Sequence, residues 1–328
     1  MAPCPAGRWV LALLVLTTGS VARAAEPEAT TDRPSEAEAR PLNRIDATHL
    51  LAARVNPLAL ALFSRISFQR RLYRAESAAL RDNYVSLGLT PTITPALGRI
   101  GVRLELQPLS VLRLAASYEA VGYVGTFDFF QSFPGVFAEH DDETLDRLSA
   151  AEQGEDRANY ATAGTRLELG ALLQGKVGPL AARSDLRLVR SSMDLRAGDR
   201  TFYDPEFDIL APNDGWILSN DLDVLWVTHF GLSVGARWTV TDAVYEDRHY
   251  APGEDTSVDP NGPTHRLGPI AAYTLWDDGG KNAFDRPTLI LVVNWWLDHR
   301  YRTGAQQSAA LPYAVLGFRV SGDLVPLD

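Results

Sequence analysis

Residues 99–107, RIGVRLELQ, alternate strictly between two kinds of side chain. The even-numbered positions from Ile100 to Leu106 are all aliphatic, whereas the odd-numbered positions include Arg103 and Glu105. A period of two is that of a β-strand, whose successive side chains point to opposite faces of a sheet. The stretch therefore predicts a strand with one apolar face and one charged face.

The same alternation recurs along most of the chain. It is clear over residues 112–119, 166–174, 183–188, 221–226 and 230–239, and weaker over 58–72, 267–276, 289–300 and 311–321. The densest apolar run, residues 289–297 (LILVVNWWL), is about half as long as the roughly 20 residues of a membrane-spanning helix. The pattern predicts an all-β protein and excludes a bundle of transmembrane helices.

Short and long connections alternate between the expected strands. Short turns are expected near residues 107–109, 176–179 and 227–228, and long loops over 127–159, 197–214 and 246–263. Tight periplasmic turns and long outer loops are typical of transmembrane β-barrels, and placing both chain ends in the periplasm requires an even number of strands. We predict a transmembrane antiparallel up-and-down β-barrel of about ten strands. The alternative is twelve, with two strands within residues 84–107 and an extra one near 44–55.

The first residues predict export. Arg8 precedes an apolar stretch at residues 9–16, and Ala22-Arg23-Ala24 forms an A-x-A site, so residues 1–24 are expected to be a signal peptide cleaved after Ala24. The only cysteine, Cys4, lies in this segment, and the mature chain therefore has neither a disulfide nor a thiolate metal site.

The rest of the chain divides into a leader and a barrel. Residues 25–56 are expected to form a flexible periplasmic leader, because residues 25–41 are rich in Ala, Glu, Pro and Thr without apolar periodicity. Residues 57–328 are the expected barrel domain. The full chain has 31 basic and 41 acidic residues; losing two arginines with the signal peptide leaves 29 against 41, a net charge of −12. Such an acidic protein is not expected to bind nucleic acid.

Alternation alone does not distinguish a membrane barrel from a soluble ligand-binding barrel, in which the apolar face points inward. Aromatic residues near the expected strand ends favour the membrane, because such residues form girdles at its two interfaces. They are Tyr118, Tyr123, Trp216, Trp226, Trp238, Tyr245, Trp276, Trp295 and Trp296. The soluble periplasmic barrel remains an alternative.

Over residues 58–321 the chain resembles the outer-membrane β-barrel proteins of Gram-negative bacteria, on its export signal, dyad repeat and turn asymmetry. The resemblance implies a location in the outer membrane, contact with its lipid and insertion by the outer-membrane assembly machinery. It includes no subfamily motif. Members commonly end in an aromatic residue that closes an assembly signal, whereas here Phe318 is followed by RVSGDLVPLD.

A barrel with its apolar faces toward lipid directs the charged faces into the lumen. The expected lumen charges are Arg65, Arg103, Glu105, Arg113, Glu119, Arg166, Glu168, Arg183, Asp185, Arg187, Asp221, Asp223, Arg237 and Asp298, with Arg300 beside them. Because both signs interleave, arginines and carboxylates are expected to pair across strands. Two roles stay open, transport through a narrow channel and a salt-bridged structural scaffold.

We expect no enzyme activity and no cofactor, with an outer-membrane hydrolase as the alternative. Asp221-Leu-Asp223 and Asp247-Arg-His249 are similar to the paired motifs of omptin proteases, but some thirteen extra residues at about 3.3 Å each would separate them by about 40 Å. His229 and Ser233 are four residues apart and do not form the H-x-S of an outer-membrane lipase.

Acidic loop residues are weak candidates for binding a divalent cation. Asp255 and Asp259 lie in a loop with oxygen-bearing side chains at every second position, a pattern that suits calcium. The loop departs from an EF-hand, since Pro260 stands where the turn glycine belongs and Arg266 where the closing glutamate belongs.

Overall fold

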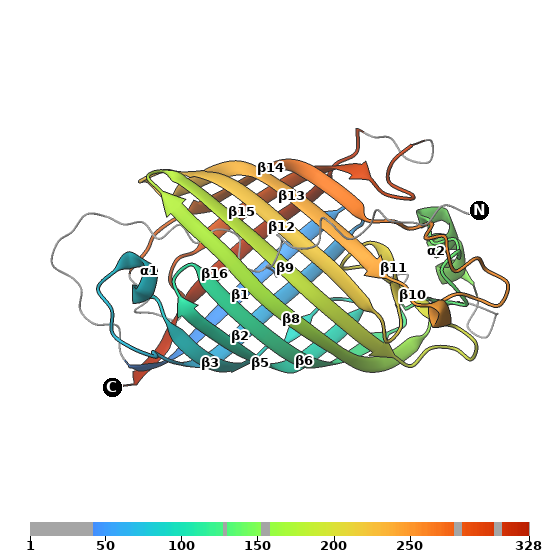
Figure 1. The fold of residues 1–328 in the computed structure, drawn as a ribbon, viewed down its shortest axis with the longest axis horizontal. Helices are drawn as coiled ribbons and strands as arrows, with labels where there is room; N and C mark the ends of the chain where they lie inside the picture. The colour runs from blue at the N-terminus through green and yellow to red at the C-terminus, as the bar shows by residue number, and fades with distance from the viewer. Residues whose placement is uncertain (1–41, 127–129, 152–157, 279–283, 305–309, 328) are drawn as a thin grey trace, which may run out of the picture.

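The alternating stretch at residues 99–107 lies in strand β5 (Leu97–Leu109), one strand of a closed antiparallel barrel (Figure 1). The computed structural model describes residues 42–126, 130–151, 158–278, 284–304 and 310–327. The other barrel strands are β1 (Asn43–Val55), β2 (Ala59–Arg70), β3 (Tyr84–Leu89), β4 (Thr92–Ile93), β6 (Leu112–Val124), β8 (Ala161–Val177), β9 (Leu180–Met193), β12 (Trp216–Val227), β13 (Leu232–Val244), β14 (Thr264–Thr274), β15 (Thr288–Asp298) and β16 (Tyr313–Leu327).

The barrel closes through β1, which pairs with β16 on one side and with β2 on the other. Strands β3 and β4 both lie between β2 and β5, so they form one membrane strand interrupted at residues 90–91. The thirteen segments of the sheet therefore make twelve strands, the alternative count from the sequence. The turn that separates β4 from β5 is capped by Thr94, whose hydroxyl accepts the N–H of Ala96 and of Leu97.

The barrel begins earlier than predicted. Strand β1 belongs to it, so the barrel starts at Asn43, and the leader predicted for residues 25–56 is wrong in its C-terminal part. The alternation of β1 is hard to see because two of its lumen-facing residues, Leu50 and Ala52, are themselves apolar. The predicted signal peptide and residues 25–41 lie outside the described residues.

Most of the long loops gather at one end of the barrel. The connections β6–β8, β9–β12, β13–β14 and β15–β16 begin and end there, as do the turns at 56–58 and 94–96. The opposite end holds both ends of the barrel sequence and the turns at residues 110–111, 178–179 and 228–231. Two longer connections, β2–β3 and β14–β15, also begin and end there, and the first contains the short helix α1 (Ala78–Arg81). We call the first the outer end and the second the periplasmic end.

The apolar faces of the strands point outward. On β5, Ile100 is 58% exposed on the outer surface, whereas Glu105, which faces the lumen, is 2% exposed. Large exposed apolar residues occur on the other strands too, for example Leu51, Leu62, Leu87, Leu114, Leu169, Leu180, Val224, Val234, Leu267, Leu291 and Leu316. This arrangement is the reverse of a soluble carrier barrel and matches a surface that contacts lipid.

The predicted aromatic girdle is only partly on this outer surface. Trp226, Trp238 and Trp295 are exposed there, but Tyr123 and Trp296 face inward and are buried. Among the described residues, no helix is long and apolar enough to cross a membrane.

Candidate functional site: the constricted lumen

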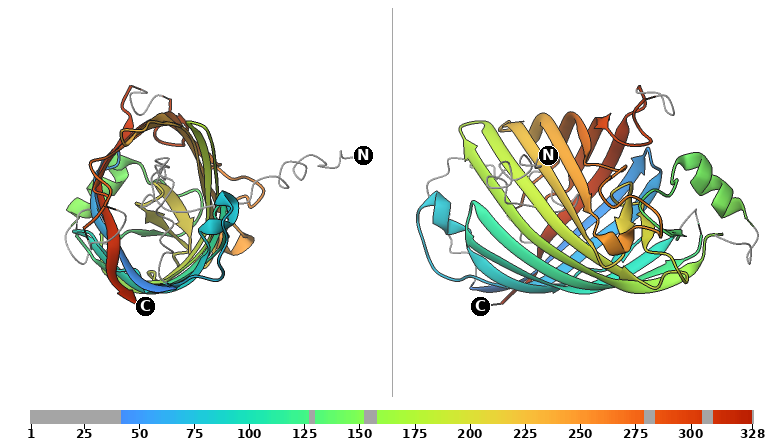
Figure 2. Two further views of the ribbon diagram at one scale, coloured as in Figure 1. Left: turned by 90° about the vertical axis from the view of Figure 1, so that its left-hand side faces the viewer. Right: turned by 45° about the vertical axis from the view of Figure 1, so that its right-hand side comes forward.

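A hairpin from the outer end folds into the barrel. Strands β10 (Thr201–Asp204) and β11 (Ile209–Pro212), with β7 (Ser132–Phe133), form a small sheet. The hairpin lies inside the ring of barrel strands when the barrel is viewed end on (Figure 2, left). The sequence predicted an outer loop over residues 197–214, and the structure turns its central part inward instead.

The composition of the hairpin explains its position. Residues 201–212, TFYDPEFDILAP, are too apolar to remain in water, and nearly all of them are buried. The turn is fixed by Asp204, whose side chain accepts the N–H of Glu206 at 2.8 Å and whose carbonyl accepts the N–H of Asp208 at 2.9 Å. The apolar side packs on lumen-facing residues of β6, β9, β12 and β13; the cluster contains Phe202, Phe207, Ile209, Ala211, Val121, Tyr123, Val189, Met193, Ile217 and Ala243.

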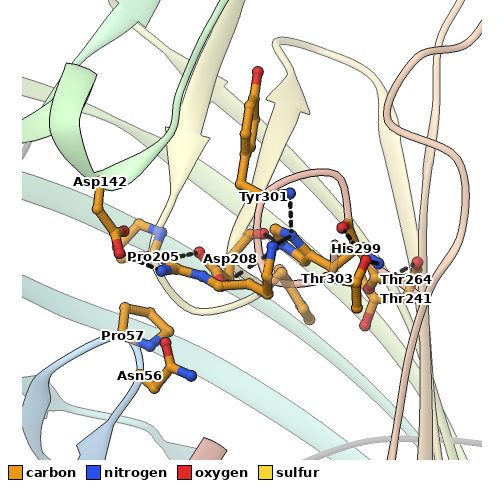
Figure 3. Close-up of polar contacts among 12 residues, drawn as sticks. Asn56, Pro57, Asp142, Pro205, Asp208, Thr241, Thr264, His299, Tyr301 and Thr303 are labelled. Atoms are coloured by element: carbon orange, nitrogen blue, oxygen red, sulfur yellow. Dashed lines mark hydrogen bonds and ion pairs between the residues drawn. The ribbon is translucent and has the colours of Figure 1, made fainter. Parts of the chain in front are cut away.

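Polar contacts fasten the hairpin to the outer loops (Figure 3). Arg302 donates to both carboxylate oxygens of Asp208, at 2.8 and 3.0 Å, and also pairs with Asp142 at the start of helix α2 (Asp142–Ala150). The Nε2 of His299 donates to the carbonyl of Asp208 at 2.7 Å. Its Nδ1 accepts the N–H groups of Tyr301 and Arg302, which assigns the proton to Nε2.

The hairpin tip places one carboxylate among three arginines. Guanidinium nitrogens of Arg99, Arg166 and Arg187 lie 2.9, 3.1 and 2.6 Å from the oxygens of Glu206. The Phe207 ring lies beneath two of these arginines, 4.9 Å from Arg187 and 5.5 Å from Arg166. Other carboxylates lie further away: Glu119 is 3.8 Å from Arg99, and Glu168 and Asp204 are 3.7 and 3.9 Å from Arg166. Glu206 is thus the carboxylate that contacts all three arginines, which come from β5, β8 and β9. We call Glu206 and these three arginines the tip cluster.

Further ion pairs lie inside the lumen, both within one strand and between strands. Arg103 contacts Glu105 at 2.9 Å and Glu168 at 3.2 Å. Arg65 reaches the same Glu105 at 3.1 Å and Asp46 at 3.4 Å. Carboxylates are therefore shared between arginines of different strands, which compensates charges that are largely removed from water.

A second group of ion pairs joins β9, β12 and β13. Arg237 donates two hydrogen bonds of 2.7 Å to Asp223 and lies 3.3 Å from Asp221. Arg183 pairs with Asp185 and lies 3.9 Å from Asp223. Such bidentate arginine contacts are among the stronger ion pairs in proteins.

The structure places the predicted lumen charges inside the barrel, except Asp298. Arg113 donates to Gln107 at 2.9 Å, and Glu119 accepts the hydroxyl of Thr90 at 3.0 Å.

Asp298 is exposed at the outer end of β15, where a bulge opposite His265 shifts the register, so its assignment to the lumen is wrong. Arg300 lies in the next loop and contacts Asn261 at 3.0 Å.

Several residues of the site were absent from the sequence prediction. Arg99 belongs to the alternating stretch itself and shares the face of Arg103, so the period-two pattern could have identified it. Arg54 donates to the carbonyl of Pro205 at 2.6 Å and to that of Glu206 at 3.2 Å. The contacts of Arg54 could be predicted only if the hairpin was known to fold inward. The apolar composition of residues 201–212 is the only signal in the sequence for that fold.

A cavity of about 180 Å³ adjoins the tip cluster. Its apolar wall comes from β1, β2 and β16 and consists of Leu50, Ala52, Ala59, Ala61, Phe63, Tyr313 and Val315. The charged residues that line it are Arg54, Arg65, Arg99, Arg103, Arg113, Arg187, Glu105, Glu119, Glu168 and Glu206. Six arginines against four glutamates leave a formal charge of +2, although the whole chain carries −10.

The acidic loop does not assemble a metal site in the described structure. Asp255 accepts the N–H and hydroxyl of Ser257, and Asp259 accepts the N–H of Asn261. Both carboxylates thus stabilise turns in their own loop. No group of three or more potential ligands arranged for a metal occurs within the described ranges.

The residues considered for a hydrolase lie apart. Asp221 and Asp223 are bound by Arg237 in the lumen, whereas His249 is in the short helix η2 (Asp247–His249) of an outer loop. The ring nitrogens of His249 contact the backbone of Glu246 and Asn213.

Comparisons with known proteins add little to this geometry. No family model matches the chain, and a search of curated proteins found no match. Solved structures with some similarity include a KdgM porin (8% identity, 84% of this chain and 98% of that chain, TM-score 0.33). Others are OccAB1 of Acinetobacter baumannii (9% identity, 89% and 100%, TM-score 0.38) and the translocator domain of the autotransporter NalP of Neisseria meningitidis (11% identity, 85% and 87%, TM-score 0.37).

Because these similarities are weak, the assignment depends on the closed sheet and its apolar outer surface. The chain has the architecture of an outer-membrane β-barrel.

Proposed function

We propose that the chain is an outer-membrane channel for small solutes, narrowed by the β10–β11 hairpin. The observation that supports this role is the cavity of about 180 Å³ beside the hairpin tip. A purely structural barrel gains nothing from a hairpin that leaves such a space, whereas a channel uses a constriction to select its solutes. No catalytic step is part of the proposal.

Hairpin deletion tests the proposal. The N–H of Asn213 donates to the carbonyl of Arg200 at 3.0 Å, so a short glycine turn can replace residues 201–212 without stretching the flanking strands. In planar bilayers, we expect small single-channel currents from the intact protein and clearly larger ones from the deletion variant. Folding of both is checked by the difference in gel mobility between unboiled and boiled samples.

A barrel whose lumen is closed would give no current in this experiment. If both proteins fold but neither conducts, the channel proposal is wrong, and the lumen is a salt-bridged scaffold. That alternative is favoured by the ion pairs that Arg65, Arg103 and Arg237 form with carboxylates inside the lumen.

We also propose that the protein reaches the outer membrane through cleavage after Ala24 and insertion by the assembly machinery. The A-x-A site and the position of Asn43 at the same end of the barrel as the tight turns support this order of events. Mass spectrometry of protein extracted from outer membranes should give a mature chain that begins at Ala25. A different N-terminal residue would contradict the cleavage site.

A further inference from the structure

The tip cluster has the chemistry of an anion-binding site that is already filled by a residue of the chain. Three guanidinium groups converge on the Glu206 carboxylate, and all three arginines are largely buried. Glu206 itself keeps 23% of its side chain exposed, more than any of its three partners. Because arginine forks bind carboxylates and phosphates in the same way, another anion could replace Glu206 there.

Replacement requires movement of the side chain and not of the hairpin. The hairpin is fixed by its apolar cluster and by the contacts between Asp208 and Arg302. Glu206 lies in the turn between β10 and β11, and it contacts the three arginines through its side chain, whereas its carbonyl accepts a hydrogen bond from Arg54. Rotation of this side chain would free the three guanidinium groups while the backbone stays in place, and Arg99 and Arg187 already line the cavity.

The apolar wall of the cavity, opposite the arginines, indicates which kind of chemical group a bound anion carries besides its charge. Leu50, Phe63 and Val315 provide an apolar surface that faces the arginines across the cavity. An apolar cavity of about 150 Å³ takes up benzene, so a space of about 180 Å³ suits a molecule with one ring or a short aliphatic chain. Burial of that part is favourable because it removes apolar surface from water.

A smaller cavity of about 20 Å³ adjoins the first and shares Arg187, Glu206 and Tyr313 with it. Asn294 lines this space and is 1% exposed, yet neither its amide oxygen nor its nitrogen has a hydrogen-bond partner among the described residues. Buried amide groups are nearly always hydrogen-bonded. A polar atom of a bound molecule, or water beside it, would satisfy this side chain.

We propose that the solute is a small organic monoanion, whose charged group competes with Glu206 for the three arginines while its apolar part lies on the β1–β2–β16 wall. This inference depends on the proposed channel function and names its substrate class. Binding to the folded protein can be measured without conduction, so failure of the two proposals can be distinguished.

The test is calorimetric titration of the detergent-solubilised full chain with benzoate, acetate and benzyl alcohol. Glu206→Gln keeps the shape of the side chain but removes the competing charge, and we expect it to bind benzoate at least tenfold more tightly than the unmodified protein. Glu246→Gln is the matched control, because Glu246 lies exposed in an outer loop outside the cavity lining, where its side chain pairs with the exposed Arg248 and takes part in the capping box of η2. It should bind benzoate as the unmodified protein does.

The apolar wall is tested separately. Phe63→Ala should weaken benzoate binding several-fold and leave the weaker binding of acetate unchanged. Benzyl alcohol, which has the ring without the charge, should gain nothing from Glu206→Gln. The proposal is wrong if benzoate binds no tighter to folded Glu206→Gln than to the Glu246→Gln control, or if acetate binds as well as benzoate.

Discussion

At the scale of single residues, the lumen depends on arginines that each serve more than one carboxylate. Arg237 is the clearest case, since it lies between Asp221 and Asp223 and all three side chains are buried. Arg237→Ala leaves two buried carboxylates without the guanidinium between them, and breaking a buried pair in this way costs about 3–5 kcal/mol. We expect a loss of that size in urea unfolding followed by tryptophan fluorescence.

Arg190→Ala is the control for this substitution. Arg190 lies 3.8 Å from Asp214, and both side chains are more than 40% exposed. Exposed pairs contribute only about 0–1 kcal/mol. Equal unfolding curves for the two variants would show that the lumen charges are solvated and that their pairing contributes little.

His140 gives the outer loops a dependence on pH. Burial lowers its pKa to about 3, from an ordinary value near 6.5, and its ring packs edge-on against Tyr301 at 4.7 Å. Between these two values the opened loop binds a proton that the closed loop does not. The closed loop is therefore stable above pH 6.5 and loses stability as the pH falls toward 3.

The size of this effect follows from about 1.4 kcal/mol for each pKa unit, so acidification from pH 6.5 to 4.5 should remove about 2–3 kcal/mol. Hydrogen exchange in residues 137–146, corrected for its intrinsic pH dependence, measures the opening. His140→Gln cannot titrate and should show much less acceleration. Equal acceleration in both proteins would assign the effect to another group, such as His299, whose pKa is also lowered by burial.

At the scale of elements, close approach of the backbones fixes the pairing of β12 and β13. A Cβ added at Gly235 would lie 1.9 Å from the carbonyl oxygen of Val224, so an alanine there forces the two strands apart. Forcing extra atoms into a packed position costs about 1–3 kcal/mol. Gly235→Ala should lower the folded fraction on unboiled gels after refolding, whereas Gly98→Ala, where nothing lies within 4 Å, should not.

The elements also show what sequence alone could predict. Strands with one charged and one apolar face, such as β5, were predicted because their period is visible. Strand β1 was only part of the twelve-strand alternative, since Leu50 and Ala52 make its lumen face apolar as well. The β10–β11 hairpin was missed because local periodicity does not say whether a loop turns inward. Asp298 was misplaced because a bulge at the strand end breaks the alternation.

At the scale of the whole molecule, the barrel reverses the usual distribution of residues, with its charges inside and its apolar residues outside. A charged residue substituted on the outer surface tests this arrangement directly. Leu104 lies within the alternating stretch of β5 and is 51% exposed on the outer face. If this face meets the middle of a bilayer, Leu104→Arg should cost about 2–4 kcal/mol. If it met water, a surface substitution would change stability by only about 0.5 kcal/mol.

A second substitution, on the outer face but at the end of the barrel, is the control for Leu104→Arg. Val177 is 83% exposed beside the tight β8–β9 turn at the periplasmic end, where a charge can reach water, so Val177→Lys should cost only about 0–1 kcal/mol. Both variants would be unfolded with urea from the same lipid vesicles and compared with the unmodified chain. A large loss for Leu104→Arg alone places the bilayer across the middle of β5. Small losses for both would mean that the outer face at Leu104 meets water and not lipid.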